Sequence, residues 1–97
     1  MMGEPPYNLE EVGCRARTFP KSWRDAAIRA LYDDERGGVL CPRCKGLFRG
    51  RRELSQLHAD HIIAWSRGGL TTWQNLQILC GPCNLAKHDS GSELPSS

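Results

Sequence analysis

The chain has 97 residues, a formal net charge of +2 and 39% hydrophobic residues, which suits one small domain with short tails. It contains no run of about 18 apolar residues, which excludes a transmembrane helix and a membrane partner. The start, MMGEPPYNLEEVG, has no basic residues followed by an apolar core, so we expect no secretory signal and a cytoplasmic protein. In a reducing cytoplasm cysteines more often bind metal than form disulfides.

The first third of the sequence is predicted to be an arm followed by a helix. Residues 1–20 are rich in proline and glycine and show no periodicity, so we expect an extended N-terminal arm in which Cys14 is a free thiol. Residues 22–36 are predicted to form a scaffold helix that Ser22 caps and the Gly37-Gly38 pair ends. We assign residues 21–90 to one domain.

The second part of the chain shows a pattern of short strands and one helix. Val39–Phe48 is predicted to form two short strands around a turn, and residues 39–89 to form the core of the domain. A strand is expected within residues 54–63, and a second one over residues 73–79. A short helix should follow from Cys80 to Asp89, and residues 91–97 should form a flexible tail.

Four of the five cysteines form two CxxC pairs separated by 35 residues: Cys41, Cys44, Cys80 and Cys83. Two intervening residues allow both sulfurs of a pair to reach one ion, and two pairs fill a tetrahedral shell. Such a closed shell is typical of a structural zinc site. The alternative is a redox dithiol, but that motif accompanies a βαβ pattern, which is not present here.

A local basic patch follows the first CxxC pair. Five basic residues fall within ten positions, and no acidic residue lies between Arg36 and Glu53: Arg43, Lys45, Arg49, Arg51 and Arg52. Such a patch suits phosphate groups. A solvated loop that carries arginines for solubility explains the charge equally well, so both interpretations stay open.

The segment HADHIIAWSRGGLTTWQNLQILCGPCNLAKH resembles the HNH endonuclease family, also called ββα-metal nucleases. The similar pattern is an acid or histidine followed by histidine, a central asparagine, and a histidine or asparagine beside the second CxxC. It covers Cys41 to His88, about half of the chain. The resemblance implies a small α+β fold, a ββα-metal (His-Me finger) core cross-linked by a four-cysteine zinc site. We expect the N-terminal helix to pack on this core.

The resemblance also implies roles for individual residues. Asp60 would bind a metal ion, and His61 would be the general base. Asn75 would hold the loop between the strands through its side-chain amide, and Asn84 would be a second metal ligand. Some members have histidine where this chain has Asp60. The last letter of the family name stands for a histidine at the position where this chain has Asn84. The resulting oxygen ligands favour magnesium or manganese as the catalytic ion.

Three further residues are candidates from position alone. His88 lies four residues after Asn84 on the predicted helix, so it shares a face with it and is a candidate metal or phosphate ligand. The alternative for His88 is a solvent-facing residue that favours the helix C-terminus. Arg67 and Lys87 are candidate phosphate contacts, together with Arg49, Arg51 and Arg52.

The strand pattern raises one geometric condition. Asp60 and His61 are neighbours, so in a regular strand their side chains point to opposite faces. Both serve one site in this prediction only if the strand ends at Asp60 and the chain turns there.

These observations lead to three hypotheses about function. The first is a metal-dependent endonuclease, a hydrolase that cuts double-stranded DNA with weak sequence preference and nicks it as a monomer. The second is a non-catalytic zinc module that binds nucleic acid, and the third is a zinc-containing protein-interaction module. Asp60, His61 and Asn84 together favour the first, because a binding module needs no general base beside an oxygen-rich ion site.

Overall fold

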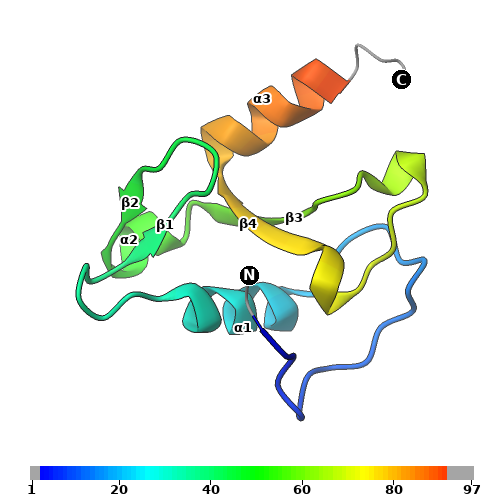
Figure 1. Ribbon diagram of the computed structural model, residues 1–97, viewed down its shortest axis with the longest axis horizontal. Helices are drawn as coiled ribbons and strands as arrows, with labels where there is room; N and C mark the ends of the chain where they lie inside the picture. The colour runs from blue at the N-terminus through cyan, green and yellow to red at the C-terminus, as the bar shows by residue number, and fades with distance from the viewer. Residues whose placement is uncertain (1–2, 92–97) are drawn as a thin grey trace.

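The computed structural model describes residues 3–91, and of residues 88–91 it describes the backbone only. Two small antiparallel sheets, β1–β2 and β3–β4, are combined with three α-helices and two short 3-10 helices (Figure 1). In chain order the elements are α1 (Lys21–Leu31), β1 (Val39–Leu40), β2 (Leu47–Phe48), α2 (Gly50–Leu54), β3 (Leu57–His61), η1 (Trp65–Arg67), η2 (Trp73–Asn75), β4 (Leu76–Cys80) and α3 (Gly81–Gly91).

The β3–β4 sheet lies at the centre, with α1 packed on one side and α3 on the other (Figure 1). Its register pairs Leu57 with Cys80 and His61 with Leu76. The apolar residues Ile78 and Leu57 are almost fully buried, and the side chains of α1 cover them. The β3–β4–α3 unit is the predicted ββα core, and α1 is the helix packed on it. The α+β fold class is therefore confirmed.

The helix α1 differs from its prediction at both ends. It begins at Lys21 after Pro20, and Ser22 does not cap it, because the Ser22 hydroxyl donates to Glu10 at 2.7 Å. It ends at Leu31, five residues before the predicted end at residue 36. The Asp33 carboxylate accepts backbone N–H bonds from Glu35 and Arg36. This local turn competes with continued helix and explains the early end.

The basic stretch after β2 also differs from its prediction. A solvated loop was one interpretation of this stretch, but Gly50–Leu54 is a short helix, α2. The Glu53 carboxylate accepts the Arg49 backbone N–H at 2.6 Å and so satisfies one of the free donors at the helix start. The arginines therefore project from a helical turn.

Residues 3–20 contain no helix or strand, and the arm crosses the domain in contact with α1 and with the chain around η2 (Figure 1). Two buried tryptophans hold it through its backbone: Trp23 Nε1 donates to the Glu10 carbonyl at 2.6 Å, and Trp73 Nε1 donates to the Gly3 carbonyl at 3.0 Å. The Thr71 N–H donates to the Cys14 carbonyl at 2.7 Å. The arm is thus part of the packed structure.

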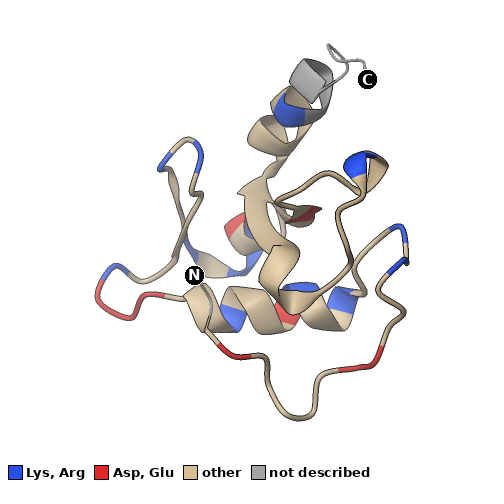
Figure 2. Ribbon diagram, turned by 45° about the vertical axis from the view of Figure 1, so that its right-hand side comes forward, with Lys and Arg blue, Asp and Glu red and all other residues tan. Residues whose placement is uncertain are grey.

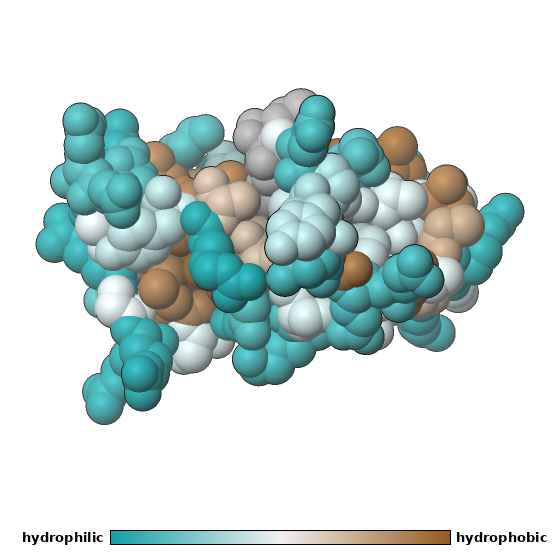
Figure 3. Space-filling view, turned by 90° about the horizontal axis from the view of Figure 1, so that it is seen from below, coloured by the Kyte–Doolittle hydropathy of each residue, from teal (hydrophilic) through white to brown (hydrophobic). Residues whose placement is uncertain are grey.

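The surface is mainly hydrophilic. Seen from below, on the side of α1 and the arm, apolar residues form separate small patches between hydrophilic side chains (Figure 3). Among the residues that the structure describes, no helix has the length and hydropathy needed to cross a bilayer.

The core makes a direct stability prediction. Replacing Ile78, which is 1% exposed, by Ala should lower the free energy of unfolding by about 2–5 kcal/mol, because it removes packed methyl groups and leaves a cavity. The matched change Ile63→Ala, at a side chain that is 58% exposed, should stay within about 0.5 kcal/mol. Chemical denaturation of both variants checks this. If the free energy of unfolding of Ile78→Ala changed as little as that expected for Ile63→Ala, Ile78 would not be a core residue.

Candidate active site and metal centre

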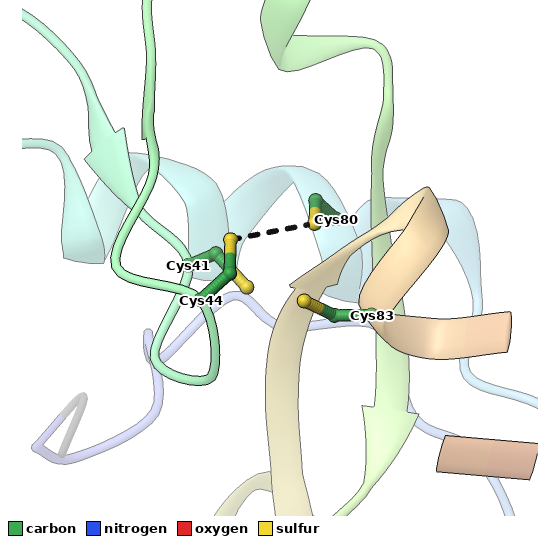
Figure 4. Close-up of side chains that lie close together, drawn as sticks. All are labelled: Cys41, Cys44, Cys80 and Cys83. Atoms are coloured by element: carbon green, nitrogen blue, oxygen red, sulfur yellow. Dashed lines mark hydrogen bonds between the residues drawn. The ribbon is translucent and has the colours of Figure 1, made fainter. Parts of the chain in front are cut away.

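The four CxxC cysteines come together in one cluster (Figure 4). Cys41 and Cys44 lie in the turn between β1 and β2, Cys80 ends β4, and Cys83 is in the first turn of α3. All four sulfur atoms lie within 4.8 Å of one another, and the Cys44 and Cys80 sulfurs are 3.8 Å apart. Sulfurs bound at about 2.3 Å to one tetrahedral ion are about 3.8 Å apart, so the cluster fits zinc.

The cluster is electrostatically prepared for a cation. Burial raises the pKa of Cys41, but the backbone N–H groups of Cys44, Cys80 and Arg43 outweigh this and hold it at about 6. Burial, followed by the three neighbouring cysteine side chains, raises the pKa of Cys83 to about 12. The thiols thus oppose one another's ionisation. A bound divalent cation removes this opposition, because it stabilises all four thiolates.

Asp60 forms a second polar centre on the α3 side of the sheet. Asp60 is 5% exposed, and its Oδ2 accepts hydrogen bonds from Gln77 Nε2 at 3.0 Å and Lys87 Nζ at 2.5 Å. Gln77 lies opposite Asp60 in the register, and Lys87 comes from α3. A hollow of about 210 Å³ adjoins them, lined by Pro42, Arg43, Gln77, Leu79 and Lys87.

The Lys87 ammonium also lies at the outer edge of β3. The Ile62 N–H donates to the Asn75 carbonyl, so the backbone groups of the preceding residue, His61, point away from β4. Lys87 Nζ donates to this outward His61 carbonyl at 2.5 Å. A cation is therefore held between a carboxylate and a carbonyl oxygen, which are ligand types that magnesium and manganese prefer.

Asn84 adds an oxygen from the first half of α3. Its Oδ1 is buried and accepts no hydrogen bond from any residue within the described part of the chain. A buried carbonyl oxygen without a donor is costly, and a cation satisfies it. Asp60 and Asn84 thus have the chemistry expected of ligands for a divalent ion. His88 follows in α3, but its side chain lies outside the described residues.

His61 is buried on the α1 side of the sheet, where the arm covers it. Its Nε2 is 2.9 Å from the Thr71 hydroxyl, and the Phe19 ring packs on the imidazole with 4.3 Å between centroids. Thr71 donates its hydroxyl proton to the Ala16 carbonyl, so it can only accept from His61. Nε2 therefore carries the proton, and Nδ1 is the basic nitrogen.

The charge state of His61 follows from its surroundings. Burial lowers its pKa, Asp60 partly opposes this, and Lys87 lowers it further. The net effect is a pKa below the ordinary value for histidine, which keeps the imidazole neutral at neutral pH. A neutral imidazole with a free Nδ1 lone pair is able to accept a proton.

The geometric condition for Asp60 and His61 is not met. The strand β3 continues through His61, which pairs with Leu76, and does not end at Asp60. The two side chains therefore leave opposite faces: Asp60 contacts Lys87 of α3, and His61 contacts Thr71 and Phe19. The sheet has only two strands, so its edge at β3 is the place from which both faces can be reached.

Asn75 joins the ends of the loop that follows β3. Its Oδ1 accepts the Ile63 N–H at 2.8 Å, and its Nδ2 donates to the carbonyls of Ile63 at 3.1 Å and Leu70 at 2.8 Å. Gly69 lets this loop close, because a Cβ there would overlap the Ile63 carbonyl oxygen. The loop begins directly after His61, so this bracing fixes the end of β3.

The predicted phosphate contacts fall in different places. Arg49, Arg51 and Arg52 belong to α2 and its N-cap, Arg67 is exposed in η1, and Lys87 is bound to Asp60. Two residues that the sequence did not indicate contact the candidate catalytic side chains: Thr71 contacts His61, and Gln77 contacts Asp60. The pairing of β3 with β4 places Gln77 beside Asp60, and the packing of the arm places Thr71 beside His61. Neither contact corresponds to a sequence motif.

The family model named HNH endonuclease matches residues 41–90, slightly more than half of the chain. The chain belongs to the HNH endonuclease family. Members of this family are usually nucleases that use divalent metal ions and act on nucleic acid. No curated protein and no solved structure matches this HNH chain. The match includes both CxxC pairs, Asp60, His61 and Asn84, whereas the arm and α1 lie outside it.

The cysteine cluster predicts tightly bound zinc in this HNH protein. Elemental analysis should find about one zinc per chain, and Cys41→Ser should lose zinc and unfold, since binding energy at such sites is folding energy. Cys14→Ser should keep both zinc and melting temperature, because Cys14 is exposed and outside the cluster. Zinc retained at full stoichiometry in Cys41→Ser would contradict a four-cysteine site.

Proposed function

We propose that the chain is a metal-dependent HNH endonuclease that hydrolyses DNA phosphodiester bonds. The observation that carries this proposal is the cation position at the edge of β3, where the Lys87 ammonium contacts both Asp60 and the His61 carbonyl. Asn84 presents a buried oxygen without a donor, among the described residues, on the adjoining helix. Together they support an oxygen-rich ion site beside a neutral histidine.

Asp60 and Asn84 would hold the ion, and His88 is a proposed additional ligand. Magnesium or manganese is the proposed metal because the two assigned ligands are oxygens. When bound, such an ion supplies charge relief to the phosphoryl oxygens and to the departing oxygen. Gln77 donates to the Asp60 carboxylate and so fixes its orientation from the neighbouring strand.

His61 is the proposed general base. Its Nδ1 takes a proton from the attacking water, whose oxygen then bonds to phosphorus as the ester P–O bond breaks. Thr71 and the Ala16 carbonyl hold the imidazole in the tautomer that leaves Nδ1 free. A substrate phosphate placed across the outer edge of β3 is reached from both faces of the two-stranded sheet, by Asp60 on one side and His61 on the other.

Double-stranded DNA is the proposed substrate. Arg49, Arg51, Arg52 and Arg67 are exposed and offer guanidinium groups to backbone phosphates. Contacts of this kind carry no sequence information directly, which supports weak sequence preference. One chain holds one candidate site, so we propose that it acts as a monomer and nicks one strand per encounter.

A non-catalytic nucleic-acid-binding module is the second candidate. It is favoured by the burial of His61, which is 8% exposed beneath Phe19, and by the Lys87 ammonium at the proposed ion position. In a nuclease, the Phe19 ring must move off His61 when substrate binds, and the Lys87 ammonium must leave Asp60 when the metal binds. Cleavage assays on variants decide between the two functions.

His61→Ala should keep the zinc and DNA binding but reduce plasmid nicking by roughly 10²–10⁴-fold, the usual range for a general base. The matched change His58→Ala, at an exposed position of the same strand, should leave nicking unchanged. Nicking is measured on supercoiled plasmid with manganese, with open circles expected before linear product. If both variants nick as the parent does, His61 is not the base and the binding-module function gains support.

Lys87→Met should tighten manganese binding by about tenfold, or ~1.4 kcal/mol, because it removes the cation that competes with the metal for the Asp60 carboxylate. Titration of zinc-loaded protein, followed through the electron paramagnetic resonance signal of free manganese, measures this affinity without any cleavage. Lys45→Met, which removes an exposed lysine elsewhere, is the control. Unchanged affinity in Lys87→Met would place the ion away from Asp60.

A further inference from the structure

We propose that the N-terminal arm, which lies outside the family match, provides the main phosphate-binding surface for duplex DNA. This arm surface consists of Arg15, Arg17 and Arg67, gathered around Trp65. The inference rests on the proposed function, because it identifies where the DNA that is cut would be held. It adds two arginines that neither the sequence motifs nor the family match assigns.

Contacts to Trp65 bring the three arginines together. Trp65 Nε1 donates to the Arg15 carbonyl at 3.2 Å, and the Arg17 guanidinium carbon lies 5.1 Å from the centre of the Trp65 ring. Arg67 follows two residues later in the same 3-10 helix, η1. Figure 2 shows basic segments of the arm and of η1 on the same side of the molecule. All three arginines are exposed.

The arm is fixed in place before any ligand binds. Thr71, which is almost fully buried, holds it twice: its N–H donates to the Cys14 carbonyl and its hydroxyl donates to the Ala16 carbonyl. Arg15 and Arg17 flank Ala16, so these bonds anchor the backbone between them. Stacking on Trp65 further orients the Arg17 guanidinium. Such preorganisation lowers the conformational entropy lost on binding.

The charges of the arm surface are available to a ligand. Lys21 and Arg24 pair with Asp25, Arg36 pairs with Asp33 and Lys87 pairs with Asp60. The three arginines of the arm surface form no ion pair with any residue in the described range. The sequence also has no acidic residue between Glu11 and Asp25 or between Asp60 and Asp89. The surface is therefore a local source of uncompensated positive charge.

A groove between α1 and α2 is a weaker candidate. It is lined by Lys21, Arg24, Arg29 and Arg51 among others. The Arg24 guanidinium is already committed, because it donates to the carbonyls of Leu57 and Leu54. This groove also adjoins the Leu57 end of β3, four residues or about 13 Å from His61.

The position of the arm surface favours DNA as its partner. Thr71 contacts both the arm and His61, so the arm surface adjoins the proposed base directly. Phosphates next to the one that is cut would therefore meet Arg15, Arg17 and Arg67. Planar guanidinium groups bind phosphate oxygens in pairs, and three of them suit consecutive charges on a backbone. An acidic protein segment is the alternative partner.

The test measures binding of a fluorescent DNA duplex by anisotropy between about 50 and 200 mM salt, in the zinc-loaded His61→Ala background without added divalent ions. Replacing Arg15, Arg17 and Arg67 by Ala should reduce the slope of log affinity against log salt by about 2.7, because each lost phosphate contact removes about 0.9. The control variant replaces Lys21, Arg29 and Arg36 by Ala and loses the same charge; its slope should change by less than about 1.

A second comparison ranks the two basic regions. Replacing Arg49, Arg51 and Arg52 by Ala should change the slope less than the arm variant does, and melting temperatures show whether each variant folds. If the arm variant melts early, Arg67→Ala alone, which leaves the arm intact, should still lower the slope by about 0.9.

The outcomes separate the two proposals. An arm variant with the parent slope, or a parent that binds polyglutamate but no duplex, overturns the arm surface as a DNA site. A reduced slope in the arm variant supports it even if the parent protein nicks no plasmid with any metal, in which case only the nuclease proposal fails.

Discussion

The cluster of four cysteines is the constraint on which the candidate site depends. It joins the turn between β1 and β2 to the end of β4 and the first turn of α3, segments that are 35 residues apart in sequence between Cys44 and Cys80. Because Cys83 immediately precedes Asn84, the same cross-link fixes where α3 presents Asn84 and Lys87 to the sheet. A zinc ion bound by the four cysteines would therefore set the geometry of the candidate site without taking part in its chemistry.

Packing divides the proposed chemistry between the two faces of β3. On one face Lys87 and Gln77 surround the Asp60 carboxylate, and on the other Thr71 and Phe19 surround His61. A buried carboxylate needs a positive partner, and Lys87 fulfils this need where we propose that a divalent ion binds. On the other face the arm orients His61 through Thr71, because the Ala16 carbonyl fixes the direction of the Thr71 hydroxyl.

Local signals in the sequence predicted part of this arrangement. CxxC spacing and strand alternation gave the cysteine cluster, the β1–β2 turn and the order of β3, β4 and α3. The end of α1 was missed because the Asp33 side chain replaces helical hydrogen bonds, and α2 because five residues show no periodicity. Asp60 and His61 lie on opposite faces because β3 continues through His61, which pairs with Leu76 of β4. The position of the arm depends on bonds to its backbone carbonyls, which no residue type reveals.

The proposed hydrolysis at the edge of β3 requires an ion distinct from the structural zinc. The most direct measurement is manganese titration of a zinc-loaded preparation, with plasmid nicking and zinc content followed in the same samples. We expect no nicking before manganese is added, nicking that saturates as manganese rises, and about one zinc per chain throughout. Full nicking by protein that holds zinc alone, in the presence of a chelator for other ions, would contradict it.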